Sequence, residues 1–265
     1  MTQQRNFPIG APILEVKDIS LSFGGVKAIT NSSFSVLQHE IKAIIGPNGA
    51  GKSSMLNCIN GIYKPQQGTI AFKGKVLDKI SPNSIAQIGV SRTFQNLALF
   101  KRMSVLDNIL VGRRLHMNAN FLSVAFQFPK ARREEKANRE KCDEIVEFLE
   151  IQDIRDTPVG KLPYGLQKKV ELGRALATEA EVLLLDEPMA GMNVEEKREM
   201  CRFILKVNDE LGTTMVLIEH DMGVVMDISD NVVVLDYGKI IADGPPDEVR
   251  NNQDVIDAYL GVAHD

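Results

Sequence analysis

The segment Gly46–Ser53 reads Gly-Pro-Asn-Gly-Ala-Gly-Lys-Ser and has a spacing suited to phosphate binding. The apolar run Ile41–Ile45 precedes it, and the helix-compatible segment Ser54–Cys58 follows it. Glycines at this spacing let backbone N–H groups converge on one anion, and a helix N-terminus adds positive charge. Lys52 then supplies a mobile charge to the β- and γ-phosphates of a nucleotide. The residues expected to contact nucleotide here are Gly46, Pro47, Asn48, Gly49, Ala50, Gly51, Lys52, Ser53 and Ser54.

Two consecutive acids, Asp186 and Glu187, end a second apolar run, Val182–Leu185. A phosphate-binding loop needs an acid that holds Mg²⁺, and a neighbouring buried strand fixes the position of that acid. We expect Asp186 to orient the Mg²⁺ shell together with the hydroxyl of Ser53. Glu187 is expected to take a proton from the attacking water as a general base. The alternative is a strand that simply ends in a solvated turn.

Composition limits the classes of protein to consider. The chain has 265 residues, 44% of them hydrophobic and 25% charged, which suits one large core. A net charge of -4 provides no sequence-wide positive field, so nucleic acid is not expected as a ligand. The three cysteines form no CxxC pair, which favours a reducing compartment, and no apolar run is long enough to span a bilayer. We therefore expect a cytoplasmic protein.

Apolar patterning predicts a β-rich first third and then alternating helices and strands. A long stretch, 96–160, is predicted to be mostly helical, and within it one face should be buried at the i, i+3, i+4, i+7 positions Cys142, Ile145, Val146 and Leu149. Short, continuous apolar strands between helices predict a parallel sheet covered on both faces. The predicted strands are Ile13–Ser22, a segment near Ser33–Leu37, Ile41–Ile45, Thr69–Phe72, Gly89–Gln95, Val182–Leu185, Thr214–Ile218, Asn231–Asp236 and Lys239–Ala242.

Together these motifs resemble the ATP-binding cassette family over nearly the whole chain. Leu162–Gln167, Leu-Pro-Tyr-Gly-Leu-Gln, stands where that family has its signature, with Tyr164, Gly165 and Gln167 as nucleotide contacts. Gln95 matches the glutamine loop, near Mg²⁺ and water. His220 matches the switch histidine, beside the γ-phosphate, and Phe23 matches the aromatic residue that stacks on adenine.

Each of these single residues also has a plainer interpretation. Phe23 could be a core aromatic, Gln95 a surface side chain, and His220 a helix cap or a satisfied buried histidine. Their joint order with the two nucleotide motifs favours the family roles. The resemblance implies an α/β P-loop NTPase with a mixed, mainly parallel sheet core, an N-terminal antiparallel β subdomain and an inserted α-helical subdomain. A single domain at 10–265 is expected, with the insertion at 96–160 and a helical tail at 245–265.

The resemblance further implies an ATPase that uses ATP and Mg²⁺ and drives membrane transport. Within the family, Tyr164–Gln167, Met189–Asn193, the long insertion and the C-terminal segment are similar to the ATPase subunits of branched-chain amino-acid importers. The implied partners are permease transmembrane subunits, a second cassette (the same chain or a paralogue) and, indirectly, a substrate-binding protein. The chain would then lie at the cytoplasmic face of the inner membrane. The alternatives are urea or lipopolysaccharide as cargo, a soluble cassette protein without a membrane partner, and a P-loop kinase.

Two residues depart from the family pattern. Pro163 stands where the signature usually has serine, and Asn193 stands where the loop after the acid pair usually has aspartate. Proline is expected in the first helical turn, with neither a hydroxyl nor an N–H for a phosphate. Asparagine still forms hydrogen bonds but carries no charge.

Overall fold

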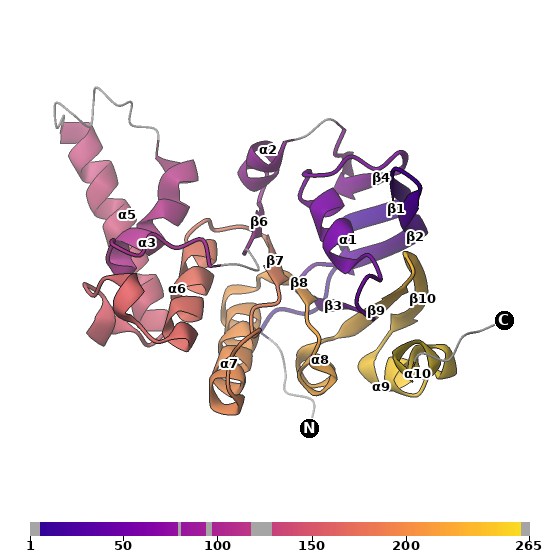
Figure 1. Cartoon of the computed structure of the whole chain (residues 1–265). Coiled ribbons are helices and arrows are strands. Elements are labelled where there is room, and N and C mark those ends of the chain that lie inside the picture. Colours follow the sequence, from indigo (N-terminus) through magenta and orange to yellow (C-terminus); the bar gives the residue numbers. More distant parts are fainter. Residues whose placement is uncertain (1–5, 79–80, 94–96, 118–128, 261–265) are drawn as a thin grey trace.

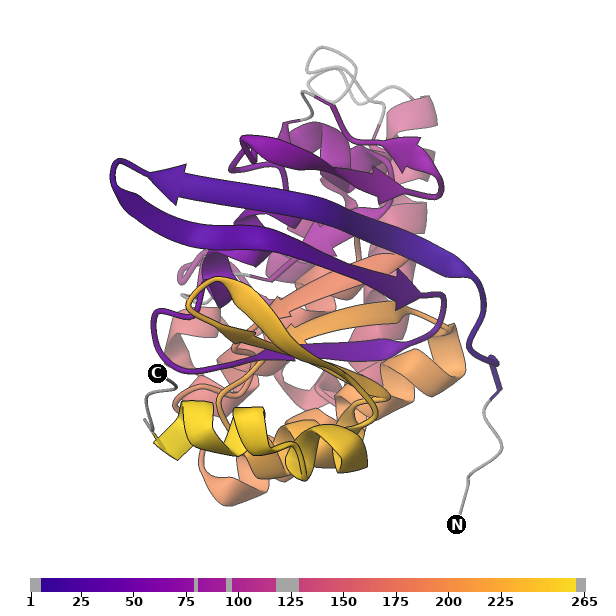
Figure 2. The same ribbon diagram turned by 90° about the vertical axis from the view of Figure 1, so that its right-hand side faces the viewer.

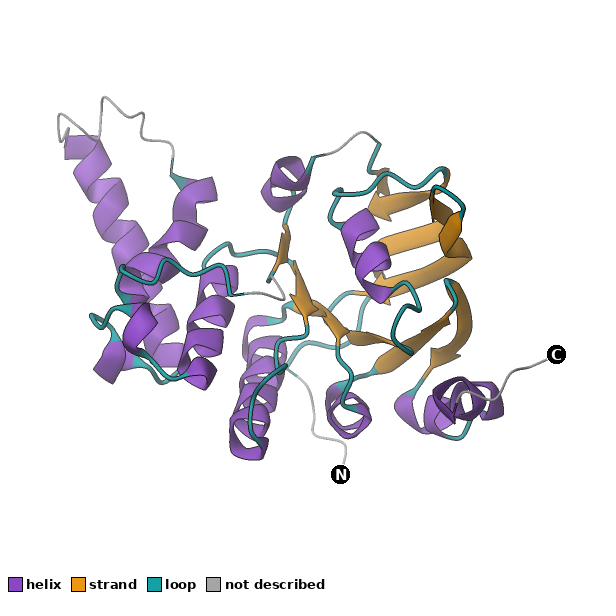
Figure 3. Ribbon diagram, viewed as in Figure 1, coloured by secondary structure: helices purple, strands orange, loops and turns teal. Residues whose placement is uncertain are grey.

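The computed structural model describes residues 6–78, 81–93, 97–117 and 129–260. These residues form two sheets and a set of helices that lie mostly to one side of them (Figures 1 and 3). The larger sheet has the strand order β10-β9-β3-β8-β7-β6, and the smaller sheet has the order β2-β1-β4-β5. The expected P-loop NTPase fold with a mixed, mainly parallel sheet is confirmed.

The large sheet is built on three fully buried strands, β3 (Ile41–Ile45), β7 (Val182–Asp186) and β8 (Thr214–Ile218). These strands are parallel, as are β6 (Val90–Arg92) and β9 (Asn231–Asp236) with their partners. Only β10 (Lys239–Gly244) runs antiparallel, as the second arm of a hairpin with β9. Because the carboxyl ends of parallel strands share one edge, Gly46, Glu187 and Glu219 all leave the sheet on the same side.

The continuous apolar runs arise because both faces of this sheet are covered. Side chains alternate along β7, so that Leu183 and Leu185 pack toward the helical side while Val182 and Leu184 pack toward the small sheet. On β3, Ile44 faces the small sheet, whereas Ala43 and Ile45 pack against the C-terminal helices. Because both faces are covered, these strands are mostly apolar and show no alternating pattern. The buried polar exception in β3 is Lys42, which forms ion pairs with Glu40 and Asp243.

The small sheet is antiparallel. It pairs β1 (Pro12–Phe23) with β2 (Val26–Leu37) and with β4 (Gln67–Phe72), and it ends at β5 (Lys75–Val76). Figure 2 shows the long β1–β2 hairpin lying across one side of the molecule. Strand β2 begins well before the predicted segment near Ser33. The polar run Thr30–Ser33 hid this extension, because Ser32 is buried and donates a hydrogen bond to the carbonyl of Gly238.

Helices α1 and α2 connect strands of the two sheets: α1 follows β3 of the large sheet and α2 follows β5 of the small sheet. Helix α1 (Lys52–Ile59) packs between the small and large sheets, with Met55, Leu56 and Ile59 buried. Helix α2 (Pro82–Gln87) precedes β6, which is shorter than the predicted strand Gly89–Gln95. Gln95 itself lies outside the described residues.

The helical insertion is confirmed as helix-rich. It contains α3 (Val105–Gly112), α5 (Pro129–Phe148) and the short turns η1 (Arg113–His116), η2 (Gln152–Ile154) and η3 (Val159–Lys161). The predicted buried face is correct, since Cys142, Ile145, Val146 and Leu149 all belong to the core. Helices α6 (Tyr164–Leu176) and α7 (Val194–Leu211) link this core to the large sheet.

The remaining helices are α8 (Met222–Ile228), α9 (Pro246–Arg250) and α10 (Gln253–Leu260). The last two lie within the stretch 245–265 that was expected as a tail, and they pack beside β9 and β10 (Figure 2). Among the described residues, no helix is both long enough and apolar enough to cross a bilayer.

Candidate nucleotide site

The phosphate-binding loop connects β3 to α1, as predicted. Gly46 has a φ of 146° and Gly51 has a φ of 103°, both in the left-handed range that favours glycine. A Cβ on Gly46 would lie 2.0 Å from the carbonyl oxygen of Leu235, and one on Gly51 would lie 2.4 Å from that of Ala28. Neighbouring strands therefore allow only glycine at these two positions. The loop is held against the large and small sheets before any ligand contributes.

Lys52 is the charged centre of this loop and is buried. Its ammonium donates to the carbonyl oxygens of Gly46 at 2.8 Å and Pro47 at 3.0 Å, so the side chain folds back over its own loop. Burial lowers the pKa of Lys52, and the charge of Glu187 opposes that shift. Asn48, Gly49 and Ser53 are exposed beside it, where backbone and hydroxyl groups remain accessible to an anion. Ser54 is half-buried.

Asp186 ends β7 and is 3% exposed. Its Oδ2 accepts from Arg92 at 2.6 Å, and Arg92 also donates to Asn57 Oδ1 at 2.6 Å. Its other oxygen, Oδ1, is buried and has no hydrogen-bond partner among the described residues. A buried carboxylate oxygen needs a donor or a cation. This oxygen therefore fits the expected role of Asp186 as a ligand of Mg²⁺.

Magnesium prefers oxygen ligands and usually takes only one or two carboxylates from the protein. The donors available here, the Asp186 carboxylate and the Ser53 hydroxyl, suit that preference. Bound Mg²⁺ would neutralise charge on the phosphate oxygens. The proposed third ligand, Gln95, lies outside the described residues, so its place in the site stays a prediction.

Glu187 follows Asp186 and has a φ of 49°, a rare backbone conformation for a non-glycine residue. Its backbone N–H donates to Ile218 at 2.9 Å, which fixes it to the end of β8. Its Oε1 lies 2.8 Å from Nε2 of His220. Because a carboxylate only accepts, the hydrogen must be on Nε2 of the imidazole. Backbone strain of this kind is concentrated at functional sites, where surrounding contacts maintain it.

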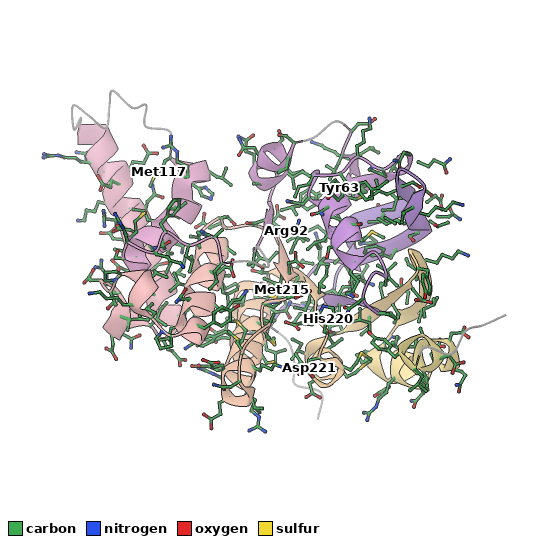
Figure 4. The ribbon with its side chains drawn as sticks, in the orientation of Figure 1. Tyr63, Arg92, Met117, Met215, His220 and Asp221 are labelled. Carbon is green, nitrogen blue, oxygen red and sulfur yellow. The ribbon has the colours of Figure 1, made fainter. Side chains whose placement is uncertain are left out.

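The histidine is not a buried core residue. The His220 side chain is 45% exposed, while that of Glu187 is 14% exposed, so the pair opens to the surface beside the phosphate-binding loop. Figure 4 shows His220 and Arg92 in the central part of the molecule, between the helical insertion and the small sheet. Helix α8 is capped by Asp221 and not by His220. Both plainer interpretations of His220 are therefore wrong.

Phe23 ends β1 and is 46% exposed, so it is not the core aromatic that was the alternative. Tyr63 meets it edge-on, with ring centroids 5.0 Å apart and planes inclined by 70°. Tyr63 follows the C-terminal end of α1, the helix that begins at the phosphate-binding loop. An exposed ring such as Phe23 suits stacking on a nucleotide base, which stays a prediction.

The signature residues lie apart from this site. Figure 1 shows α6 and α1 on opposite sides of β7. Pro163 stands just before α6 with φ −53° and ψ 155°, so the expectation that it lies within the first helical turn is wrong by one residue. The Gln167 amide donates to its own loop at Leu162 (2.7 Å). Tyr164 is 40% exposed, and its ring would lie 3.3 Å from a Cβ placed on Gly191.

Gly165 packs against α7. A Cβ at this position would lie 2.4 Å from Glu196 Oε1, so a larger residue here would displace the Glu196 side chain. Glu196 in turn forms a capping box with Asn193, each side chain accepting from the backbone N–H of the other. Asn193 is therefore a helix cap, a role for which asparagine is as suitable as aspartate.

Three residues of the site were not identified from the sequence: Arg92, Asn57 and Glu219. Arg92 could have been noticed as a charged residue in the short strand before the glutamine loop, because a cation beside the strand that carries Asp186 suggests an ion pair. Asn57 lies within α1 and gives no such signal. Glu219 could have been noticed as an acid directly after a fully apolar strand, as Asp186 and Glu187 were.

Comparison with known proteins gives one consistent result. Residues 29–190 match the family model described as ABC transporter, and residues 239–265 match the model described as branched-chain amino acid ATP-binding cassette transporter. The high-affinity branched-chain amino acid transport ATP-binding protein BraF of Pseudomonas aeruginosa is 41% identical over 95% of this chain and 99% of that protein. The corresponding protein LivG of Escherichia coli K12 is 38% identical over the same shares.

Among solved structures, the ADP conformation of MJ1267, an ATP-binding cassette of an ABC transporter, is 33% identical and has a TM-score of 0.82. The match covers 94% of this chain and 99% of that one. The phosphate-binding loop, the acid pair and the histidine that contacts Glu187 thus occur in a chain similar to such cassettes along nearly its whole length. The protein belongs to the ATP-binding cassette family and is an ABC-type ATPase.

Proposed function

We propose that this chain powers an importer of branched-chain amino acids by hydrolysing Mg-ATP at the loop Gly46–Ser53. The observation that carries the cargo assignment is the likeness to BraF along 95% of this chain and 99% of that protein. The match of residues 239–265 to the branched-chain amino-acid model supports the same assignment. The cassette itself touches no cargo, so its specificity for a transport system must come from its partners.

In the proposed mechanism, Lys52 and the loop amides hold the phosphates, and Glu187 accepts a proton from the attacking water. His220 is positioned to assist, because its Nε2–H donates to Glu187 Oε1 at 2.8 Å. That contact orients the carboxylate and keeps one of its oxygens engaged. Phosphoryl transfer depends mainly on such positioning and on charge stabilisation.

We further propose that two cassettes act together. The N-terminus of α6, with Tyr164 and Gly165, is separated from the loop of its own chain by the large sheet. It is a candidate to close over the nucleotide of a second cassette, either a copy of this chain or a paralogue.

Permease subunits are the proposed membrane partners. A groove of about 360 Å³ lies between β6, α3 and α6, beside the helical insertion. Phe100 is 53% exposed and Leu115 is 36% exposed along it, which suits an apolar contact. The apolar segment from Phe121 to Phe128 of the insertion lies outside the described residues. Docking there would hold the chain at the cytoplasmic face of the membrane, with a substrate-binding protein acting indirectly through the permease.

The test is transport in cells that lack this chain but keep the permease subunits of the same transport system. Restoring the wild-type gene should restore uptake of labelled leucine, isoleucine and valine, while Lys52→Ala should not restore it. Urea uptake serves as the cargo control. Restored urea uptake without leucine uptake would contradict the cargo, and ATP hydrolysis with no effect on either would contradict the transport role.

A further inference from the structure

Glu219 follows β8 directly and is 4% exposed. In the parallel ladder, Ile218 pairs with Asp186, so Glu219 leaves its strand at the level where Glu187 leaves β7. A carboxylate this well buried requires compensation for its lost hydration. Burial raises the pKa of Glu219, and hydrogen bonds from two backbone amides act in the opposite direction.

Both oxygens of Glu219 accept from backbone groups in two different loops. Oε1 accepts from the N–H of Met189 at 2.8 Å, in the segment that follows Glu187. Oε2 accepts from the N–H of His220 at 3.2 Å. One side chain thus links the backbone behind the proposed general base to the backbone of the histidine that contacts it.

A second contact, nearer the surface, joins α7 to the His220 loop. Lys197, in the first turns of α7, forms an ion pair with Asp221 at 2.7 Å, and Asp221 caps α8. Helix α7 begins at the Asn193 cap, so the segment Met189–Asn193 is held to the His220 loop at both of its ends. Of the two contacts, the one made by Glu219 is buried, whereas Lys197 is 30% exposed.

We infer that Glu219 is a positioning residue for ATP hydrolysis, which ties the segment Met189–Asn193 to the His220 loop so that His220 stays on Glu187. The inference rests on the proposed roles of Glu187 and His220. Only a carboxylate can accept from both amides, because glutamine offers one acceptor oxygen and would turn its NH₂ toward the other N–H. A residue that merely filled the core would not need two acceptors aimed at these two loops.

The first test compares Glu219→Gln with the wild type. We expect kcat for ATP hydrolysis to fall by about 10- to 100-fold, the scale of a small misplacement of a catalytic group. The affinity for ATP should not change, since Lys52 and its loop are untouched. Glu40→Gln is the matched control: Glu40 is 3% exposed and accepts from the N–H of Leu37 at 2.7 Å, at the opposite end of β3. The control should keep the wild-type kcat even where its thermal stability falls.

The second test asks whether Glu219 acts through His220. In a His220→Ala background, Glu219→Gln should lower kcat little further, because effects on one functional unit are not additive. A full additional loss in the double variant would overturn the inference, as would an unchanged kcat in Glu219→Gln alone. If Glu219→Gln binds no nucleotide, Glu219→Asp takes its place, because its shorter side chain would draw the carboxylate away from the N–H of Met189. An unchanged kcat in that variant would also overturn the inference.

A third comparison distinguishes a failure of this inference from a failure of the proposed catalytic roles of Glu187 and His220. Glu187→Gln and His220→Ala are measured in the same assay. If both keep wild-type turnover, the proposed catalytic roles fail. If both lose turnover while Glu219→Gln keeps it, only the inference about Glu219 fails.

Discussion

The N-termini of α1 and α6 are both proposed to face phosphate, yet they are built differently. In each helix the described residues provide no side-chain cap, whereas Ser104 and Asp221 cap α3 and α8. Before α1, Gly46 and Gly51 are fixed against neighbouring backbone. Lys52, the first residue of α1, is buried and donates to carbonyl oxygens of the loop. Before α6, Pro163 is the last residue outside the helix and Tyr164 is 40% exposed.

This difference indicates which of the two proposed phosphate contacts is organised within a single chain. The phosphate-binding loop is braced by β2, by β9 and by Gly238 in the turn after β9, so it is organised before nucleotide arrives. At the N-terminus of α6, Tyr164 is 40% exposed, Gly165 is buried, and the described residues supply no side-chain cap. In the proposed function, the phosphate that meets this terminus is bound by a second cassette. Changes in the loop should therefore act on the isolated chain, and changes near Pro163 should depend on protein concentration.

The largest effect is expected for Lys52→Ala. This change removes the one mobile positive charge of the loop, so ATP binding or hydrolysis should be lost. Binding of a fluorescent ATP analogue and phosphate release measure the two steps. Lys206→Ala is a suitable control, since Lys206 also donates to a backbone carbonyl, that of Phe148 at 3.1 Å, far from the loop. Wild-type ATPase activity in Lys52→Ala would refute the site assignment.

Glu187→Gln should keep ATP binding and lower turnover by roughly 10²–10⁴-fold, the usual effect of losing a positioned general base. With hydrolysis blocked, ATP should persist between two cassettes. Size-exclusion chromatography with Mg-ATP should then show a stable dimer. A variant that stays monomeric at high concentration would contradict the idea that α6 completes the site of a second chain.

Phe23→Ala should weaken ATP affinity by about 1–3 kcal/mol, the usual contribution of an aromatic ring stacked on a base. The ring is 46% exposed, so little thermal stability should be lost. Titration with ATP and a thermal melt distinguish the two effects. Unchanged affinity with a lower melting temperature would instead assign Phe23 to the packing against Tyr63.

The smallest effect is expected for Pro163→Ser, which restores a hydroxyl at the start of α6. One hydrogen bond to a charged group is worth about 1.5–3 kcal/mol, so closure of two cassettes should become easier. Basal ATPase activity should rise severalfold, and the protein concentration at half-maximal rate should fall. Pro82→Ser, at the first turn of α2, is the control. If both values stay at the wild-type level, Pro163 only shapes the turn.

Much of the fold was predictable from local pattern. The runs Ile41–Ile45 and Thr214–Ile218 have the predicted bounds, because strands buried on both faces consist mostly of apolar residues. The beginning of β2 at Val26 was missed, since its polar residues bond to groups outside their own strand: Ser33 to Asp18, and the buried Ser32 to the carbonyl of Gly238. The partner of Ser32 is 206 residues away in sequence and leaves no trace in local pattern.

The sequence by itself determined the chemistry of the phosphate-binding loop and the acid pair, because their function depends on residue types at fixed short spacing. Only the tertiary structure decided that His220 lies 2.8 Å from Glu187, that Arg92 occupies one oxygen of Asp186, and that Glu219 joins two loops. These contacts form where the parallel strands β6, β7 and β8 end at one edge of the sheet. Strand order places residues more than 90 positions apart within hydrogen-bonding distance there, and spacing along the chain does not encode strand order.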